Sequence, residues 1–378
     1  MLKTHEIALD PSDRQRTLLA KSAGTARFAY NWALSKWNGQ YGAWKADPSL
    51  DKPTQANLRK ELNRAERESF PWMLDAAKCA PQEAIINLGK AFENFFAGRA
   101  AYPTFKKRGA HDGFKVSAGF FKISENRIML PKTGWIKTFE ALRYEGAKLA
   151  GAATSRTADQ WFASAVCEAA GGAESQGAES QGAEETAEKT AGIDAGVREY
   201  AASDGDRRPV PRAYRNLERQ IIHAQRSVSR KEKGGKNRSK AKLRLAKLHA
   251  KAASIRSDWL RRMTAEIVHE NSAAAIEDLN VGGMKKNHRL AKSIADAAFG
   301  EFRRQLECKA KEKGAKIIAA GRFYPSGKIC SVCGAKKERL PLSERVWNCE
   351  ICGSRHDRDL NAAVNLKKYA DSSAVSAC

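Results

Sequence analysis

Four cysteines near the end of the 378-residue chain form two C-x2-C pairs, Cys330 with Cys333 and Cys349 with Cys352. Fifteen residues separate the pairs, a spacing typical of a tetrathiolate zinc site. A closed site of this kind is structural, because it leaves no coordination position open for water. We therefore predict a zinc ribbon over residues 323–354, in which Zn²⁺ folds a segment that has little apolar core.

A strong excess of basic residues restricts the partners of the chain. The 67 Lys and Arg outnumber the 43 Asp and Glu and give a formal net charge of +24. Such an excess repels itself in the folded state unless a polyanion neutralises it. Membrane lipid is one such polyanion, yet no apolar run approaches the ~20 residues of a spanning helix, and the N-terminus lacks a secretory signal. We expect a cytoplasmic protein with reduced thiols that binds nucleic acid and no membrane.

The first half of the chain combines helical and β patterns. Residues 4–9 alternate weakly, which predicts an edge strand, and helical periodicity follows, with helices expected at 55–69 and 81–97. Beyond residue 97, short apolar runs separated by Gly, Pro and Asn are typical of a small β-barrel or a sheet. The expected boundaries are 1–10 and 98–170 for the barrel and 11–97 for an inserted helical domain.

A low-complexity stretch divides the chain in two. Residues 171–190 contain a tandem GAESQ repeat and few apolar residues, which predicts a disordered linker. In the second half, strands are expected at 273–276 and 316–320, and helices at 293–312 and 360–369.

Residues 212–262 hold seventeen Lys and Arg against three acids. Two apolar stripes separated by Gly234-Gly235 predict a helical hairpin over 212–270, with one packed face and one cationic face. Such a surface could be merely solvated, but like charges one turn apart destabilise a helix, and a bound phosphate backbone would remove that penalty.

Three acidic residues stand at expected strand ends or at the start of a helix. Asp194 lies within Gly-Ile-Asp-Ala-Gly, Glu277 ends the strand predicted at 273–276, and Asp359 begins the last predicted helix. An RNase H-like sheet brings the first strand, the fourth strand and the final helix together at one edge. Carboxylates gathered there would bind two Mg²⁺ or Mn²⁺ ions for phosphodiester hydrolysis. Each acid also has a plain structural interpretation, as a turn residue or a solvated strand end.

Several segments have a recognisable wording and order: ARFAYNWAL (26–34), AFENFF (91–96), PTFKKR (103–108), LPKTGWIK (130–137), GIDAGVREYAASDG (192–205), AIEDLNVGGM (275–284), the four cysteines, and HDRDLNAAVNL (356–366). Together they resemble the TnpB family, transposon-encoded RNA-guided DNA endonucleases related to the type V CRISPR effectors. The resemblance spans almost the whole chain.

The resemblance implies a RuvC nuclease domain over 191–322 and 355–370, interrupted by the zinc ribbon and followed by a tail from residue 371 to 378. Asp194, Glu277 and Asp359 would be its catalytic, metal-binding acids. Asp357 competes for the third place, but the family acid precedes an x-Asn-Ala-Ala segment, which selects Asp359. The partners implied are a guide RNA derived from the transposon end and a target double-stranded DNA. The chain and the guide RNA would form a monomeric ribonucleoprotein in a bacterial cell. This complex would associate with the nucleoid when it is bound to DNA.

Three groups of residues are candidates for contact with nucleic acid. The hairpin offers Arg215, Arg219, Arg226, Arg230, Lys240, Arg244 and Lys247. The segment 103–122 interleaves Phe with cations, among them Lys106, Lys107 and Arg108, although its Phe side chains could equally form barrel core. Lys78 and Gln82, one helical turn apart, match in position a polar pair that TnpB-like proteins use to read a short motif beside the target.

The predicted fold is therefore multidomain α+β. A helical recognition domain is inserted in a small β-barrel (wedge) domain, and an RNase H-like (RuvC) α/β nuclease domain with an inserted four-cysteine zinc ribbon follows. The predicted function is RNA-guided DNA cleavage. A repressor or transposition regulator that binds DNA without cutting, and a cut-and-paste transposase, are the alternatives, since one fold supports several chemistries.

Overall fold

The structure is a computed structural model, and it describes residues 2–144, 146–168, 189–341 and 343–375. It divides into two compact units, Met1–Glu179 and Ser180–Cys378, each with its own hydrophobic core. Residues 171–188 of the predicted linker lie outside the described residues. Thr190, the last residue of the predicted linker, is the first residue of a strand.

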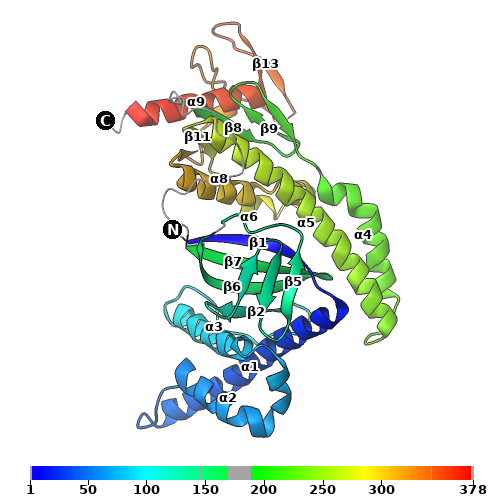
Figure 1. The fold of residues 1–378 in the computed structure, drawn as a ribbon. Helices are drawn as coiled ribbons and strands as arrows, with labels where there is room; N and C mark the ends of the chain where they lie inside the picture. Colours follow the sequence, from blue (N-terminus) through cyan, green and yellow to red (C-terminus); the bar gives the residue numbers. More distant parts are fainter. Residues whose placement is uncertain (1, 145, 169–188, 342, 376–378) are drawn as a thin grey trace. The chain divides into compact units, whose positions relative to one another are not determined.

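An antiparallel sheet of seven strands forms the body of the first unit (Figure 1). In sheet order its strands are β2 (Gly113–Ser117), β6 (Lys148–Thr157), β7 (Gln160–Glu168), β1 (Leu2–Asp10), β5 (Gly134–Thr138), β4 (Arg127–Leu130) and β3 (Lys122–Ser124). The outermost strands, β2 and β3, do not pair with each other in the described part of the chain. The sheet is open, so the closed barrel that the sequence predicts is not what these strands form.

β1 lies in the middle of this sheet, and the prediction of an edge strand at residues 4–9 was wrong. It pairs with β7 along almost its whole length and with β5 at its end. His5, Ile7 and Leu9 are buried, so the weak alternation does mark one buried face. The partners come from residues more than a hundred positions away, and a local pattern carries no information about them.

Three helices are inserted between β1 and β2: α1 (Asp13–Ala46), α2 (Gln55–Ser69) and α3 (Cys79–Phe96). A short 3₁₀ turn, η1 (Pro71–Asp75), precedes α3. Ser12 begins α1 with a capping box, in which its hydroxyl accepts from the Gln15 backbone N–H and the Gln15 side chain accepts from the Ser12 N–H. The Trp37 and Phe92 rings stack at 4.3 Å between centroids and join α1 to α3.

The second unit is built on a mixed sheet of five strands. In sheet order they are β10 (Arg207–Pro209), β9 (Glu199–Ala202), β8 (Thr190–Ala195), β11 (Ala273–Glu277) and β12 (Lys316–Ala320). β8, β11 and β12 run parallel, whereas β9 and β10 are antiparallel to their neighbours. The first strand of the unit, β8, and its fourth, β11, are therefore adjacent, as the sequence predicts.

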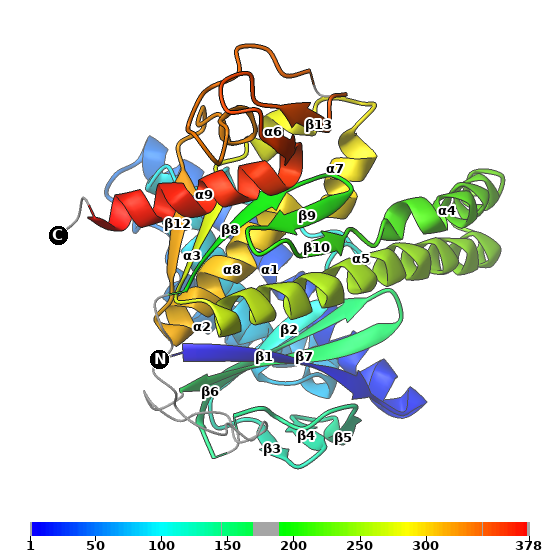
Figure 2. The same cartoon turned by 90° about the horizontal axis from the view of Figure 1, so that it is seen from above.

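Helices cover both faces of this sheet (Figure 2). On one face α5 (Lys236–Glu270) and α8 (Phe299–Lys313) enclose the main core of the unit, which includes Ile193 and Ile276. On the other face lies α9 (Arg358–Val375), whose Leu366 and Ala370 form a buried cluster with Ala275 and Ala320. Side chains along β8 and β11 therefore alternate between the two helical layers.

The basic hairpin is present as predicted. α4 (Ala213–Ser229) packs on α5 through a small apolar cluster that includes Leu217, Ile221 and Ala252. The helices are separated at Gly234, whose φ of +92° is a conformation that favours glycine.

The single helix predicted over 293–312 is broken into two. α7 (Ala291–Ala297) follows the short α6 (Val281–Met284), and α8 starts after Ala298, which has a left-handed φ of +54°. The residue at the break is an alanine, and the nearby Gly300 lies inside α8, so periodicity alone predicts a continuous helix. The break allows both Ile294 and Phe299 to enter the same core.

A cysteine-containing segment lies between β12 and α9. It holds the 3₁₀ turn η2 (Ser326–Lys328) and a two-stranded antiparallel ribbon of β13 (Val346–Asn348) and β14 (Arg355–Asp357). α9 runs to Val375, so most of the tail predicted from residue 371 is helical, and residues 376–378 lie outside the described chain.

α9 crosses β8 at Gly192 with the two backbones almost in contact. A Cβ atom on Gly192 would lie 1.9 Å from the carbonyl oxygen of Ala363 and 2.5 Å from the backbone nitrogen of Lys367. Both atoms belong to the main chain and cannot rotate away. Only glycine permits this approach, which explains the glycine at this position of the strand.

We predict that Gly192→Ala forces α9 away from the sheet. Overpacking of this kind costs about 1–3 kcal/mol or more, and each kcal/mol lowers the melting temperature of a unit of this size by roughly 2–4 °C. The matched control is Gly300→Ala in α8, where an added Cβ meets nothing within 4 Å and the higher helix propensity of alanine should be neutral or stabilising. Thermal unfolding followed by circular dichroism measures both, and equal melting temperatures for the two variants would contradict the crossing.

Candidate functional site

Two of the three predicted acids lie side by side at one edge of the five-stranded sheet. Ile193 of β8 pairs with Ile276 of β11 in a parallel register. Asp194 and Glu277 are the next residues of their strands, and they point to the face opposite Ile193 and Ile276. This is the face that α9 covers.

The Gly192 crossing brings the third acid to the same place. Asp359 lies one helical turn before Ala363 on the same side of α9, and Asp194 lies two residues after Gly192 on the same face of β8. The negative charge of Asp359 acts on the Asp194 carboxyl, which indicates that the start of α9 lies near the end of β8. Asp359 therefore comes to the edge where Asp194 and Glu277 end their strands.

The three carboxylates affect one another electrostatically. The pKa of Asp194 is raised well above its usual value, first by burial and then by the negative charges of Glu277 and Asp359. A half-buried carboxylate beside two others is unfavourable in the absence of a cation. The donor set, oxygen only, fits a hard divalent ion such as Mg²⁺ or Mn²⁺.

Each of the other two acids has a side-chain partner that the sequence did not reveal. The hydroxyl of Ser326 in η2 donates to the Glu277 carboxylate at 2.7 Å. Arg345 contacts both carboxylate oxygens of Asp359, at 3.1 and 3.3 Å. In the described part of the chain, the carboxylate oxygens of the three acids do not all lie within 4.8 Å of one another, whereas the four cysteine sulfur atoms do. Glu277 and Asp359 are instead held by Ser326 and Arg345.

Asp357 has a structural role that separates it from Asp359. Its carboxylate accepts from the backbone N–H groups of Asp359 and Leu360 at the start of α9 and forms a salt bridge with Arg207 at 2.7 Å. Burial acts in the opposite direction, but the Leu360 N–H and the Arg207 guanidinium hold the pKa of Asp357 below its usual value. Asp357 thus caps the helix.

A cavity of about 570 Å³ adjoins Asp359 and Asp357. Its charged lining residues are Arg198, Glu199, Arg207, Arg212, Arg215, Asp296, Arg345, Asp357 and Asp359. Arginines thus surround one acid of the site on a concave surface, as recognition of a phosphate group would require.

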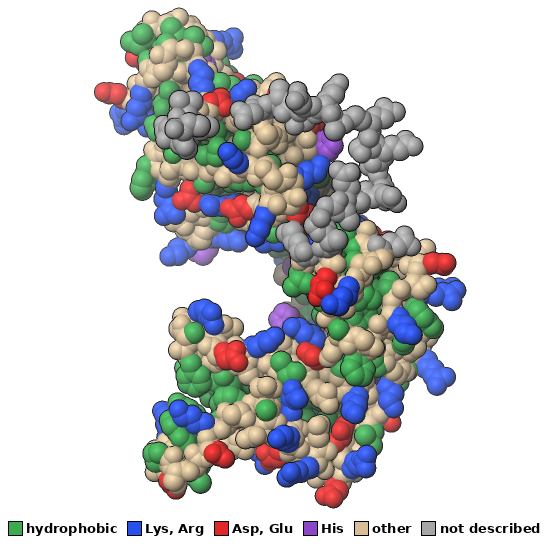
Figure 3. Space-filling model, turned by 60° about the vertical axis from the view of Figure 1, so that its left-hand side comes forward, with side chains coloured by type: hydrophobic (Ala, Val, Ile, Leu, Met, Phe, Trp, Pro, Cys, Tyr) green, Lys and Arg blue, Asp and Glu red, His purple; other side chains and the backbone are tan. Residues whose placement is uncertain are grey.

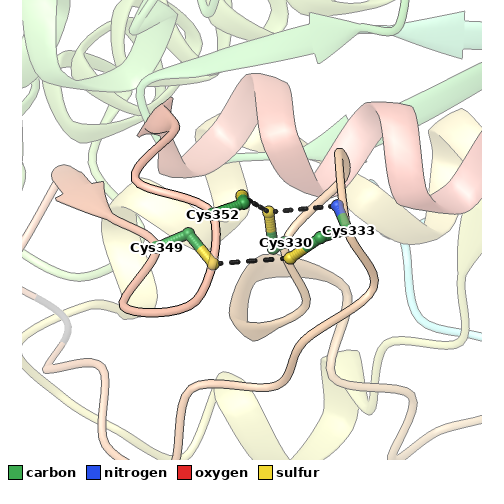
Figure 4. A group of neighbouring side chains, drawn as sticks. All are labelled: Cys330, Cys333, Cys349 and Cys352. Carbon is green, nitrogen blue, oxygen red and sulfur yellow. Dashed lines mark hydrogen bonds between the residues drawn. The ribbon is translucent and has the colours of Figure 1, made fainter.

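The four cysteines form the one group of potential ligands in the described residues whose ligand atoms all lie within 4.8 Å of one another (Figure 4). The sulfur atoms of Cys330 and Cys352 are 3.6 Å apart, and those of Cys333 and Cys349 are 3.5 Å apart. A tetrahedral zinc site with Zn–S bonds near 2.3 Å has sulfur atoms about 3.8 Å apart. The cluster therefore has the dimensions to hold a tetrahedral metal ion.

Two asparagines of α9 attach the cysteine segment to the nuclease-like sheet. Asn361 donates to the carbonyl of Ile329 at 2.7 Å and accepts from the Ser331 N–H, directly beside Cys330. Asn365 donates to the carbonyls of Ser326 and Ile329, both at 2.7 Å. Both amides are buried. Asn365 of α9 therefore fixes Ser326, and Ser326 in turn contacts Glu277. We call the contacts of Asn361 and Asn365 with the cysteine segment the asparagine clasp, and the Asn-Ala-Ala-x-Asn spacing is its signal in the sequence.

His356 is a further residue that the sequence analysis did not single out. Its Nε2 lies 3.0 Å from the Cys330 sulfur, and its ring packs on Trp347 at 4.8 Å between centroids. The position is that of an outer-shell partner, which orients a metal ligand without binding the metal.

The structure places the seven predicted cations of the hairpin, from Arg215 to Lys247, on its exposed surface. Figure 3 shows that Lys and Arg side chains are spread over the visible surface of the molecule. Lys107 and Arg108 are exposed, whereas the Lys106 ammonium lies 4.0 Å from the centroid of the Tyr30 ring. Lys78 is exposed and Gln82 is half-buried at the start of α3. Nucleic-acid contact by these residues stays a prediction.

The aromatic residues of segment 103–122 have divided roles. Phe114 and Phe121 are buried in the core of the first unit. Phe105 and Phe120 are exposed by more than half of their surface. Core formation therefore applies to Phe114 and Phe121, and surface contact remains open for Phe105 and Phe120.

Comparisons with known proteins agree with this arrangement. Family models described as "Probable transposase", "Cas12f1-like, TNB domain" and "Helix-turn-helix domain" match residues 176–288, 299–366 and 1–45. A protein of Streptomyces pristinaespiralis named "Putative RNA-guided DNA endonuclease" is 33% identical over 97% of this chain and 89% of its own length.

This chain belongs to the TnpB family. A second family member, from Escherichia coli K12 and named "Putative RNA-guided DNA endonuclease InsQ", is 29% identical over 100% of this chain and 94% of its own. A solved Cas12f1-sgRNA-target DNA complex shares the fold, with a TM-score of 0.53 at 12% identity over 97% of this chain and 98% of the other. The helix-turn-helix match corresponds here to a strand and one long helix, β1 and α1.

No helix in the described residues combines the length and apolar character that crossing a membrane requires.

The raised pKa of Asp194 predicts a pH-dependent stability. Because the folded state holds this proton more tightly than the unfolded chain, stability falls as pH rises from about 4 through the raised pKa. Asp194→Asn should therefore raise the melting temperature at pH 8 in buffer without added Mg²⁺, and raise it less near pH 4.5.

Asp357→Asn is the matched control for this effect. The pKa of Asp357 is lowered, so its contribution is present above the unfolded pKa and its loss should destabilise the protein at pH 8. Differential scanning calorimetry at several pH values measures both shifts. Shifts of the same sign in the two variants would refute the electrostatic description.

Because Asn361 and Asn365 join the cysteine segment to α9, we predict that the cysteine cluster supports the acid site. Cys349→Ser should reduce bound metal, measured by atomic absorption, and should weaken Mg²⁺ binding by about 10–100-fold, the usual effect of losing an outer-shell partner. Cys308→Ser, at an exposed cysteine outside the cluster, is the control and should leave both unchanged. Loss of metal from the cluster with full Mg²⁺ affinity would show that the two sites are independent.

Proposed function

We propose that the chain is an RNA-guided DNA endonuclease of an insertion sequence, which cleaves DNA beside a short transposon-adjacent motif. The observation that carries the proposal is the convergence of Asp194, Glu277 and Asp359 at one edge of the sheet, from two parallel strands and the helix that crosses them. The names of the relatives from S. pristinaespiralis and E. coli support it.

The acids would bind Mg²⁺ or Mn²⁺ as an RNase H-like, RuvC-type set. Two such ions, when bound, activate a water molecule and stabilise the leaving oxygen of a phosphodiester. Ser326 orients the Glu277 carboxylate through its hydroxyl. Arg345, beside Asp359 and on the cavity wall, is placed to pair with the phosphate when the acids are neutralised by cations.

The cysteine cluster would hold a structural Zn²⁺. Four thiolates leave no open position for a substrate, and their spacing fits tetrahedral coordination. The ion would fix the segment that carries Ser326 and Arg345. It would therefore keep these two side chains in contact with Glu277 and Asp359 without taking part in the chemistry.

The remaining parts would bind the nucleic acids. We propose that the guide RNA, derived from the transposon end, pairs with one strand of the target DNA. The exposed cations of the α4–α5 hairpin would contact the backbone of this heteroduplex. Helices α1–α3 and the seven-stranded sheet would read the motif beside the target, with Lys78 and Gln82 as candidates. The complex would be a monomeric ribonucleoprotein in a bacterial cytoplasm.

Asp194→Ala tests the nuclease. With co-expressed guide RNA and Mg²⁺, the variant should cut supercoiled target plasmid no faster than background, yet bind RNA and DNA as the wild type does, because the residue holds cations rather than nucleic acid. Asp357→Asn, altered at the neighbouring acid that caps α9, should retain cleavage. Full cutting by Asp194→Ala would remove the assignment, and occupancy of DNA without nicking by the wild type would favour a repressor.

A further inference from the structure

The loop between β12 and the cysteine segment displays an aromatic side chain that the fold does not use. Phe323 is 92% exposed, the highest fraction among the exposed large hydrophobic residues of the described chain. An exposed ring forgoes the stabilisation that burial gives. Single exposed apolar residues are common on protein surfaces, so the position of this one decides whether it has a use.

The loop that carries Phe323 is anchored on both sides. Tyr324, the next residue, donates its backbone N–H to the Gly321 carbonyl at 2.8 Å and its hydroxyl to the Asn365 carbonyl of α9 at 3.3 Å. Its ring packs on Tyr369 at 4.8 Å between centroids. Phe323 is thus held outward by a fixed backbone.

Phe323 is adjacent to the acid site. Arg322, the preceding residue, donates to the Asp278 carboxylate at 3.1 Å, and Ser326 donates to Glu277 at 2.7 Å. Two consecutive acids at the end of β11 therefore bind the residues on either side of Phe323. Three residues of chain span at most about 10 Å, so the backbone of Phe323 lies within about that distance of Ser326, the residue that contacts Glu277.

We propose that Phe323 is a stacking platform for an unpaired base of the strand that is cut. This inference rests on the proposed nuclease function and adds a base-binding site to it. A base within a duplex is already stacked on its neighbours, so a protein ring beside the cleavage position can stack only on a base that is unpaired. The platform would favour single-stranded over duplex DNA at the point of cleavage.

The surroundings of the ring favour a nucleobase over a protein partner. Phe323 is preceded by the exposed Gly321 and Arg322 and followed by the half-buried Tyr324, so its neighbours along the chain do not extend it into an apolar stretch. Docking of a protein uses a contiguous apolar surface. An exposed aromatic ring, in a chain with a net charge of +24, is a feature with which proteins bind single-stranded nucleic acid.

The test compares three variants loaded with guide RNA. Phe323→Ala removes the ring, Phe323→Tyr keeps it, and Ile351→Ala is the control, because Ile351 is 78% exposed on the same segment. The probe is a short single-stranded DNA with 2-aminopurine at each of the three positions beside the cut, in the presence of Ca²⁺ to prevent cleavage. Loss of stacking on one base should weaken binding by about 5- to 100-fold and abolish fluorescence quenching at one probe position.

Phe323→Tyr and Ile351→Ala should behave as the wild type, and all three variants should keep the wild-type melting temperature because the altered side chains are exposed. Unchanged affinity and quenching in Phe323→Ala would overturn the proposal. A change only in self-association, measured by light scattering, would also overturn it and would indicate contact with a second copy. If the wild type quenches but never cuts guided plasmid, the proposed nuclease function fails while the base-binding site stands.

Discussion

The second unit depends on the close contact between α9 and β8 at Gly192. A strand and a helix normally keep apart by the thickness of their side chains, and here the absence of one Cβ brings two main chains together. The pairing of β8 with β11 sets Asp194 beside Glu277, and the crossing sets the position of α9 over them. The direction of α9 carries Asp359 toward Asp194, and the opposite face of the same helical turns carries Asn361 and Asn365 to the cysteine segment. One missing side chain thus aligns residues that are far apart in the sequence.

The acid site has an arrangement that folding alone would not favour. Three carboxylates are gathered where burial already disfavours charge, and the pKa of Asp194 is raised as a result. Arg345 and Ser326 reduce the cost for Asp359 and Glu277, but they come from a segment whose own shape depends on the four cysteines. Such local conflict with stability is typical of functional sites. It is also the reason why the cysteine cluster and the acids form parts of one structure although their donor atoms suit different classes of metal ion.

The sequence revealed the features that local spacing encodes and missed those that depend on tertiary partners. The catalytic role of Asp194, Glu277 and Asp359 stays a prediction, and the choice of Asp359 over Asp357 came from the family resemblance. The cysteines were predictable because two short turns fix their geometry, and the places of the three acids because strand ends and a helix start can be located by pattern. The clasp of Asn361 and Asn365, the Ser326 hydroxyl and the Arg345 contact were not, since each joins residues that no periodicity relates. The same limit explains the errors in the fold. The central position of β1, the open sheet and the break at Ala298 are all set by neighbours distant in the sequence.

The distribution of charge suggests an order in which the parts engage a nucleic acid. The exposed cations of the hairpin attract a phosphate backbone over a long range, and the arginines of the cavity beside Asp359 attract it locally, whereas the three acids at the edge of the sheet repel it. Asp278 is neutralised by Arg303 and Arg322, and Asp357 by Arg207. The positive charges of Arg358 and Arg345 also act on Asp194, but they do not outweigh burial and the two neighbouring acids, so the pKa of Asp194 stays raised. In the proposed nuclease, divalent ions held by the acids would reverse the local field, and so would help to admit the backbone as well as supply the chemistry.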